Sequence, residues 1–101
     1  HCREDLPDAI YFGADNTAFG GMIALEEAGI QIPEQIKIVG FDDDKPWGVE
    51  KKLKKLTTIR QPLYEVGAKA VQVLLRQIQN PETQRQKIVI KPELVIRETT
   101  E

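Results

Sequence analysis

Three consecutive carboxylates, Asp42, Asp43 and Asp44, are the residues of this 101-residue chain with the clearest potential for chemistry. They end a short β-branched run over residues 36–41, and strand interiors are depleted in Asp, so we expect them in the loop after a buried strand. Open α/β sheets bind ligands outside the carboxyl ends of their strands. Because an ionised carboxylate has about four acceptor sites, which suits adjacent sugar hydroxyls, we predict that Asp42 binds a small polar molecule.

The same cluster allows two other interpretations. The carboxylates could form a solvated turn in which Asp43 or Asp44 caps the next segment. They could also hold Mg²⁺, as carboxylates at strand ends do. Acidic phosphoryl-transfer sites, however, need a Lys at another strand end, and the third strand ends in Arg60 and Gln61. We therefore expect no metal, no cofactor and no enzymatic activity.

Three further features could contribute to a site. Asp15 is predicted to be a helix N-cap near the cleft, where a helix N-terminus favours polar ligand groups. Trp47, the only Trp, lies in a long polar loop over 43–55 and could stack on a sugar ring, anchor the loop or meet another subunit. Four lysines of that loop could dock phosphate or protein, but a solvated edge that discourages strand pairing is the favoured interpretation: Lys51, Lys52, Lys54 and Lys55.

A β-α-β unit is expected to position these residues. Residues 9–13 form its first strand, a helix runs from Asp15 to just before Gly29, and residues 36–41 form its second strand. Such a unit has parallel strands and a right-handed crossover, so the Asp15 and Asp42 turns should open on one edge. The Gly20-Gly21 pair inside the helix suggests close approach by another backbone.

The second half of the chain predicts a third strand and a second helix. Residues 56–60 form the strand, and Pro62 is expected at the first position of the helix. This helix carries a wide apolar stripe, so we expect it to be the most buried one. The apolar runs 88–90 and 94–96 form either one irregular strand or two short ones.

The composition is that of a soluble globular domain, with 41% apolar and 30% charged residues. The net charge of −2 argues against this segment binding nucleic acid alone. The single Cys cannot form an internal disulfide, which fits a reducing, cytoplasmic location. No apolar run approaches 18 residues, so no membrane contact is expected.

Six motifs in register resemble the C-terminal end of the effector domain in lac-repressor/gal-repressor (LacI/GalR) family transcription regulators. In chain order they are Pro7-Asp8-Ala9-Ile10, Asp15-Asn16-Thr17-Ala18-Phe19-Gly20, Ala28-Gly29-Ile30-Gln31-Ile32-Pro33, Ile38-Val39-Gly40-Phe41-Asp42-Asp43, Leu56-Thr57-Thr58-Ile59-Arg60-Gln61-Pro62 and Leu94-Val95-Ile96-Arg97-Glu98-Thr99.

The resemblance implies an α/β fold: part of a three-layer sandwich with a mainly parallel sheet, of the periplasmic-binding-protein-like type I C-terminal lobe. Residues 1–101 would be the C-terminal portion of an effector-binding and dimerisation domain, without its DNA-binding domain and N-terminal lobe. A small molecule, expected to be a sugar or derivative, would alter operator binding by a homodimer. The alternative is a lobe of a periplasmic-type sugar-binding protein.

The resemblance also implies roles for individual residues. Asp42 would be an effector ligand, with Ala14 and Leu63 beside the effector; Trp47 is a further predicted effector contact on the basis of its residue type. Ala14 stands where a polar Asn is common, which removes a side-chain hydrogen bond and leaves the effector's identity open. The family's dimer contact falls on the loop after the Asp42 turn and on the first helix, with three helix residues: Phe19, Met22 and Ile23.

Overall fold

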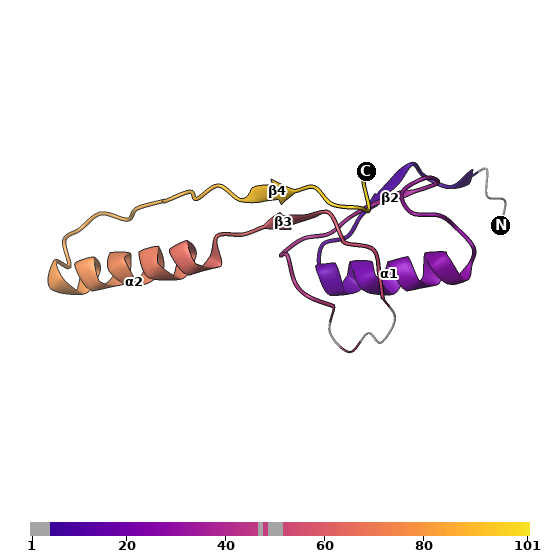
Figure 1. Ribbon diagram of the computed structural model, residues 1–101. Helices are drawn as coiled ribbons and strands as arrows, with labels where there is room; N and C mark the ends of the chain where they lie inside the picture. Colours follow the sequence, from indigo (N-terminus) through magenta and orange to yellow (C-terminus); the bar gives the residue numbers. More distant parts are fainter. Residues whose placement is uncertain (1–4, 47, 49–51) are drawn as a thin grey trace. The chain divides into compact units, whose positions relative to one another are not determined.

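The computed structural model describes residues 5–46, 48 and 52–101 (Figure 1). The chain divides into two compact units. Unit 1 comprises residues 1–60 and 94–101, and unit 2 comprises residues 61–93. The predicted site residues of the strand ends lie in unit 1.

Three parallel segments run side by side in unit 1. Strand β1 (Ala9–Tyr11) pairs in parallel with β2 (Lys37–Val39), with Ile10 opposite Ile38. On its other side, β2 meets the segment leading into β3 (Thr58–Arg60), through a parallel bridge between Val39 and Thr57. The predicted β-α-β unit is confirmed, although all three strands are shorter than the predicted ranges 9–13, 36–41 and 56–60.

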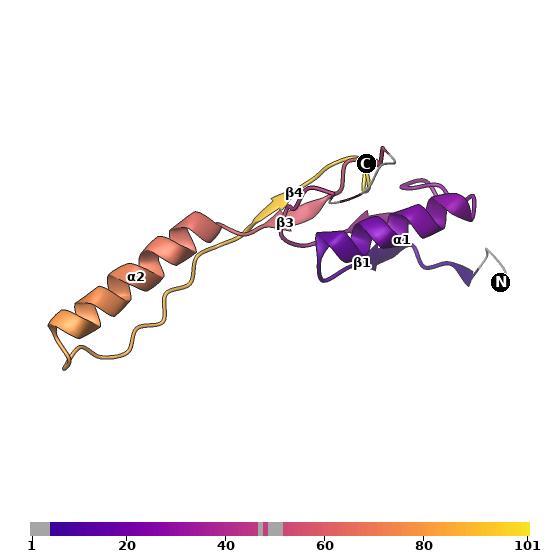
Figure 2. The ribbon, with the colours of Figure 1, turned by 90° about the horizontal axis from the view of Figure 1, so that it is seen from below.

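Helix α1 (Asp15–Glu27) packs against β2, as both ribbon views show (Figure 2). Its apolar face and the strands form the core of the described residues: Ala18, Phe19, Met22, Ile32, Ile36, Ile38 and Leu56. Gly29 ends the helix with a φ of 75°, as predicted, because glycine adopts this conformation without strain.

Of the two adjacent glycines in α1, Gly21 is crowded and Gly20 is not. A Cβ on Gly21 would lie 2.5 Å from Cζ of Phe12, whereas one on Gly20 would meet nothing within 4 Å. The expectation that another backbone approaches this pair is therefore wrong, because the neighbour is an aromatic side chain that packs against the core.

The chain returns to unit 1 through β4 (Glu93–Val95), which forms a two-stranded sheet with β3. Beyond β4, Thr99 is fully buried, and its hydroxyl donates to the carbonyl of Ile38 at 2.7 Å and accepts from the Thr57 amide at 2.8 Å. This threonine joins the last residues of the chain to β2 and to the segment that leads into β3.

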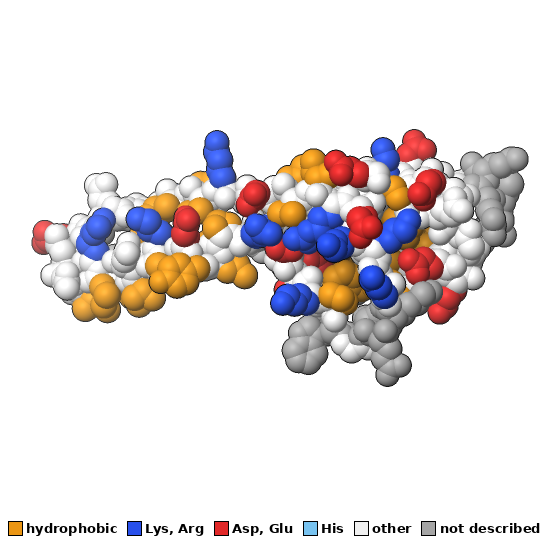
Figure 3. Space-filling view, viewed as in Figure 1, with side chains coloured by type: hydrophobic (Ala, Val, Ile, Leu, Met, Phe, Trp, Pro, Cys, Tyr) orange, Lys and Arg blue, Asp and Glu red, His pale blue; other side chains and the backbone are white. Residues whose placement is uncertain are grey.

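Unit 2 contains helix α2 (Leu63–Gln79), which begins one residue after Pro62 rather than at it. The expectation that this is the most buried helix is wrong: all of α2 is described, and none of its residues is buried. Apolar side chains gather along this unit in Figure 3, and several are more than half exposed, among them Leu63, Val71, Leu74 and Ile78. The apolar stripe predicts a packing face correctly but does not say what covers it.

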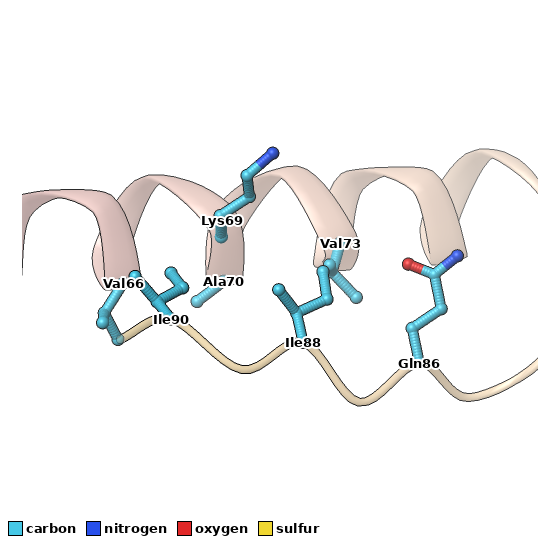
Figure 4. A pocket seen from close by; sticks show the side chains of 7 residues that line it. All are labelled: Val66, Lys69, Ala70, Val73, Gln86, Ile88 and Ile90. Atoms are coloured by element: carbon cyan, nitrogen blue, oxygen red, sulfur yellow. The ribbon is translucent and has the colours of Figure 1, made fainter. Parts of the chain in front are cut away.

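A shallow groove of about 310 Å³ lies between α2 and the extended segment 86–90 of the same unit (Figure 4). Val66 and Ala70 face Ile88 and Ile90 across it, while Lys69 points away. Residues 88–90 are extended but do not form the predicted strand, because strand assignment requires a hydrogen-bonded neighbour.

Candidate functional site

The two turns expected at one edge of the sheet do meet there. The Asp15 amide donates to the carbonyl of Phe41 at 3.1 Å, and the Asp44 amide donates to Oδ2 of Asp15 at 2.7 Å. The Asp42 amide donates to the carbonyl of Ile59 in β3 at 2.8 Å. The carboxyl ends of β1, β2 and β3 therefore converge on the turn formed by residues 41–44, which we call the acidic turn.

Asp42 is half-buried within the acidic turn and has an unusual backbone conformation. Its φ is 107° and that of Asp43 is 61°, so two successive non-glycine residues have positive φ. Asp tolerates the left-handed region better than most residues, but 107° lies outside it, and such strain persists only where the surroundings hold it. Strained backbone of this kind is characteristic of ligand-binding segments.

Asp15 is part of what holds the turn, and the prediction that it is a helix N-cap is wrong. The N-cap is Ala14, which makes no side-chain cap hydrogen bond, and Asp15 is the first helical residue. Asp15 is 1% exposed; Oδ1 accepts from the Thr58 hydroxyl at 2.8 Å, and Oδ2 accepts from the Asp44 amide. Both oxygens thus serve tertiary contacts rather than the helix end.

The fit around Asp15 is close. A Cβ on Gly40 would lie only 2.2 Å from Oδ1 of Asp15 and 2.8 Å from Cδ2 of Leu56. Glycine at the end of β2 is therefore required for the carboxylate to reach between the strands.

Asp43 is paired with an arginine through each of its carboxylate oxygens. Its Oδ1 lies 2.7 Å from Nη1 of Arg97, and its Oδ2 accepts from Nε of Arg60 at 2.7 Å. Its amide donates to the Thr58 hydroxyl at 3.3 Å. The hydrogen bond from Arg97 lowers the pKa of the Asp43 carboxyl, with a further lowering by Arg60, and the two outweigh the partial burial that raises it.

Sequence reasoning missed the partners that fix this turn. Arg60 ends β3 at the same edge as the acidic turn, so its position was predictable from the parallel arrangement. Thr58 lies two residues earlier and is fully buried, which its polar character does not indicate. Arg97 is distant in sequence, and no local signal pairs it with Asp43.

The remaining predicted residues have mixed outcomes. Ala14 is half-buried and adjoins the acidic turn, whereas Leu63 is 60% exposed at the start of α2 in unit 2. Trp47 lies outside the described residues. Phe19 and Met22 are buried in the core of unit 1, at 5% and 0% exposure, and their contribution to a dimer contact stays a prediction. Ile23 is half-buried.

The described residues also bear on metal binding and on membrane crossing. They contain no group of three or more His, Cys, Asp or Glu side chains arranged to hold a metal ion. Neither described helix has the length and apolar character needed to cross a membrane.

Comparison with known proteins gives consistent matches. Residues 1–100 match the periplasmic binding protein-like domain. The chain is 36% identical over 96 residues to the HTH-type transcriptional repressor PurR of Vibrio vulnificus, covering 95% of this chain and 28% of the relative. It is 35% identical over 98 residues to the ribose operon repressor of Haemophilus influenzae, covering 96% of this chain and 29% of the relative.

A solved structure agrees with these relatives. The LacI family transcriptional regulator from Enterococcus faecium, with bound ribose, superposes with a TM-score of 0.77 at 34% identity, over 96% of this chain and 35% of that one. The chain thus spans less than a third of the two repressors' length. The resemblance to LacI-type regulators noted in the sequence is confirmed, and the chain belongs to the periplasmic binding protein-like domain family in the form found in transcriptional regulators of the LacI family.

Proposed function

We propose that this chain is the effector-binding and dimerisation portion of a LacI-type transcriptional regulator. In the full-length protein, a small molecule bound at the acidic turn alters the affinity of a separate DNA-binding domain for its operator. The protein acts in the cytoplasm, as a regulator of transcription must. The effector is a sugar or a sugar derivative, a class consistent with the ribose bound to the Enterococcus faecium relative.

The observation that carries the proposal is the conformation of the acidic turn. Asp42 stands where three strand ends converge, half-buried and with a φ of 107°. The amides of residues 42–44 are each hydrogen-bonded to unit 1, through Ile59, Thr58 and Asp15 respectively. A carboxylate on a turn held this firmly can accept hydrogen bonds from ligand hydroxyls with little loss of conformational entropy on binding.

The other members of the site have secondary roles. Ala14 offers a methyl group beside the turn, so the effector would present an apolar or small group there. We further propose that Trp47 and Leu63 contribute apolar contacts to the bound effector. A homodimer would form through α1, whose exposed face includes Thr17 and Ala24 and which carries the predicted contact residues Phe19, Met22 and Ile23.

The test uses the full-length regulator. A thermal-shift screen against pentoses, hexoses, disaccharides, sugar phosphates and nucleosides should give at least one compound that raises the melting temperature, because a ligand that binds only the folded state stabilises it. Asp42→Ala should abolish this shift and the change in operator affinity, while operator affinity without the compound stays at the wild-type value. The loss should be about 1–3 kcal/mol of binding free energy or more.

Asp44→Ala is the matched control, because Asp44 is exposed and joins the network through its backbone amide. It should retain the thermal shift. A wild-type-sized response in Asp42→Ala would show that the effector binds elsewhere.

A further inference from the structure

Asp43 has no place in the proposed ligand contacts, yet its side chain is held by two arginines. Both carboxylate oxygens lie 2.7 Å from arginine nitrogens, and the side chain is 19% exposed. Its neighbour Asp42 carries the strained backbone. A paired carboxylate directly after a strained residue can fix the conformation of both.

The two arginines come from notable places in the chain. Arg60 is the last residue of unit 1 before the chain passes into unit 2, and Arg97 follows three residues after the chain returns at Leu94. Arg97 is itself fixed: its amide donates to the Thr57 hydroxyl at 2.7 Å, and Nη1 donates to the carbonyl of Leu56 at 3.2 Å. Asp43 therefore connects the turn to the segment before the chain enters unit 2 and to the segment after the chain leaves it.

A second contact makes the same turn sensitive to Asp43. The Asp43 amide donates to the Thr58 hydroxyl, and this hydroxyl donates to the Asp15 carboxylate. The same carboxylate accepts from the Asp44 amide. Loss of the arginine pairs would remove the charged side-chain contacts of Asp43 and leave the backbone hydrogen bonds of the turn, among them the one from the Asp42 amide to the Ile59 carbonyl. The positive φ of Asp42 would then relax towards an ordinary conformation.

We propose that Asp43 is a positioning residue: its ion pairs with Arg97 and Arg60 hold Asp42 in its binding conformation and couple effector binding to the segments that lead into and out of unit 2. The statement about effector binding rests on the proposed function. The statement about the conformation of the turn does not.

The first experiment needs no effector. Amide hydrogen exchange is measured at Asp42 in the full-length protein, where that amide donates to the Ile59 carbonyl. Asp43→Asn and Arg97→Gln should each speed exchange at Asp42 about tenfold or more, because charge-assisted hydrogen bonds are among the stronger ones. Exchange at Ile38, whose amide donates to the Thr99 carbonyl, should be unchanged. Equal exchange at Asp42 in all three proteins would overturn the proposal.

The pair is then tested as a pair. In the double variant Asp43→Asn/Arg97→Gln, the loss of protection free energy at the Asp42 amide should be smaller than the sum of the two single-variant losses. Each single variant removes the same contact between Asp43 and Arg97. Arg97→Lys keeps the positive charge and should recover part of the wild-type protection. Full additivity, or no recovery with lysine, would mean that the ion pair does not position the turn.

Effector affinity provides the functional readout, with D-ribose as the first probe. Calorimetry should give a dissociation constant for ribose that is about tenfold larger for Asp43→Asn than for the wild type. The operator affinity of Asp43→Asn in the absence of ribose should be unchanged. The control Asp44→Asn should have the wild-type dissociation constant for ribose. Faster exchange at Asp42 with unaltered ribose affinity would reduce Asp43 to a structural role and contradict the proposal. If wild-type protein binds no ribose, that finding counts against ribose as the effector, while the exchange rates still decide whether Asp43 positions the turn.

Discussion

Three adjacent aspartates in this protein have three different environments. Asp42 is half-buried with a strained backbone, Asp43 lies between two arginines, and Asp44 is exposed and contributes its amide. Asp15 completes the arrangement from another element, with both oxygens accepting hydrogen bonds. Identical side chains thus acquire different roles from their partners alone.

The Asp43 environment predicts how stability depends on pH. Its folded-state pKa is lowered, first by the hydrogen bond from Arg97, whereas the unfolded chain keeps the ordinary value of 3.8. The ion pairs therefore contribute their full stability above the unfolded pKa, and this contribution is lost as the pH falls through the folded pKa. Between pH 6 and pH 2, wild-type protein should lose more unfolding free energy than Asp43→Asn.

Urea titrations at several pH values measure this difference, with Asp8→Asn as a control at an exposed aspartate. Parallel pH profiles for wild type and Asp43→Asn would show that Asp43 is not ion-paired in solution.

At the scale of elements, α1 joins the core to the site. Its apolar face is buried against β2 while its first residue, Asp15, holds the acidic turn. A glycine-to-alanine change in a helix has two effects: it raises helix propensity, and it adds a methyl group that must fit its surroundings. Gly20 and Gly21 of α1 allow these two effects to be measured separately.

Gly20→Ala should stabilise the protein by about 0.5–1 kcal/mol, because alanine is the better helix former and the site is open. Gly21→Ala should instead destabilise it by about 1–3 kcal/mol, since the new methyl group would overlap the Phe12 ring. Urea unfolding at one protein concentration compares the two. A stabilising Gly21→Ala would mean that the Phe12 ring moves aside freely.

The sequence supports the elements of unit 1 better than their tertiary contacts. The β-α-β pattern, the Gly29 helix end and the position of Asp42 at a strand end all follow from local periodicity and turn chemistry. The role of Asp15 does not, because an aspartate at a helix start is equally compatible with capping and with a distant partner such as Thr58. The Asp43–Arg97 pair joins residues far apart in sequence and has no local signature.

At the scale of the whole molecule, the two units differ in how their apolar residues are covered. Unit 1 has a closed cluster of buried side chains beneath α1. Within unit 2 the apolar stripe of α2 faces the extended segment 86–90 across a groove, and most of the large apolar side chains of α2 are exposed. Helical periodicity predicts an apolar face from sequence, but burial requires a partner surface that periodicity cannot supply.

The central claim, that Asp42 accepts hydrogen bonds from the effector, is tested most directly by a crystal structure of the full-length regulator with the compound selected by the thermal-shift screen. A ligand hydroxyl should lie within about 2.5–3.0 Å of an Asp42 carboxylate oxygen. Asp43 should remain paired with Arg97 and Arg60 in that complex. A bound ligand that leaves the Asp42 carboxylate without contact would contradict the proposed role of Asp42.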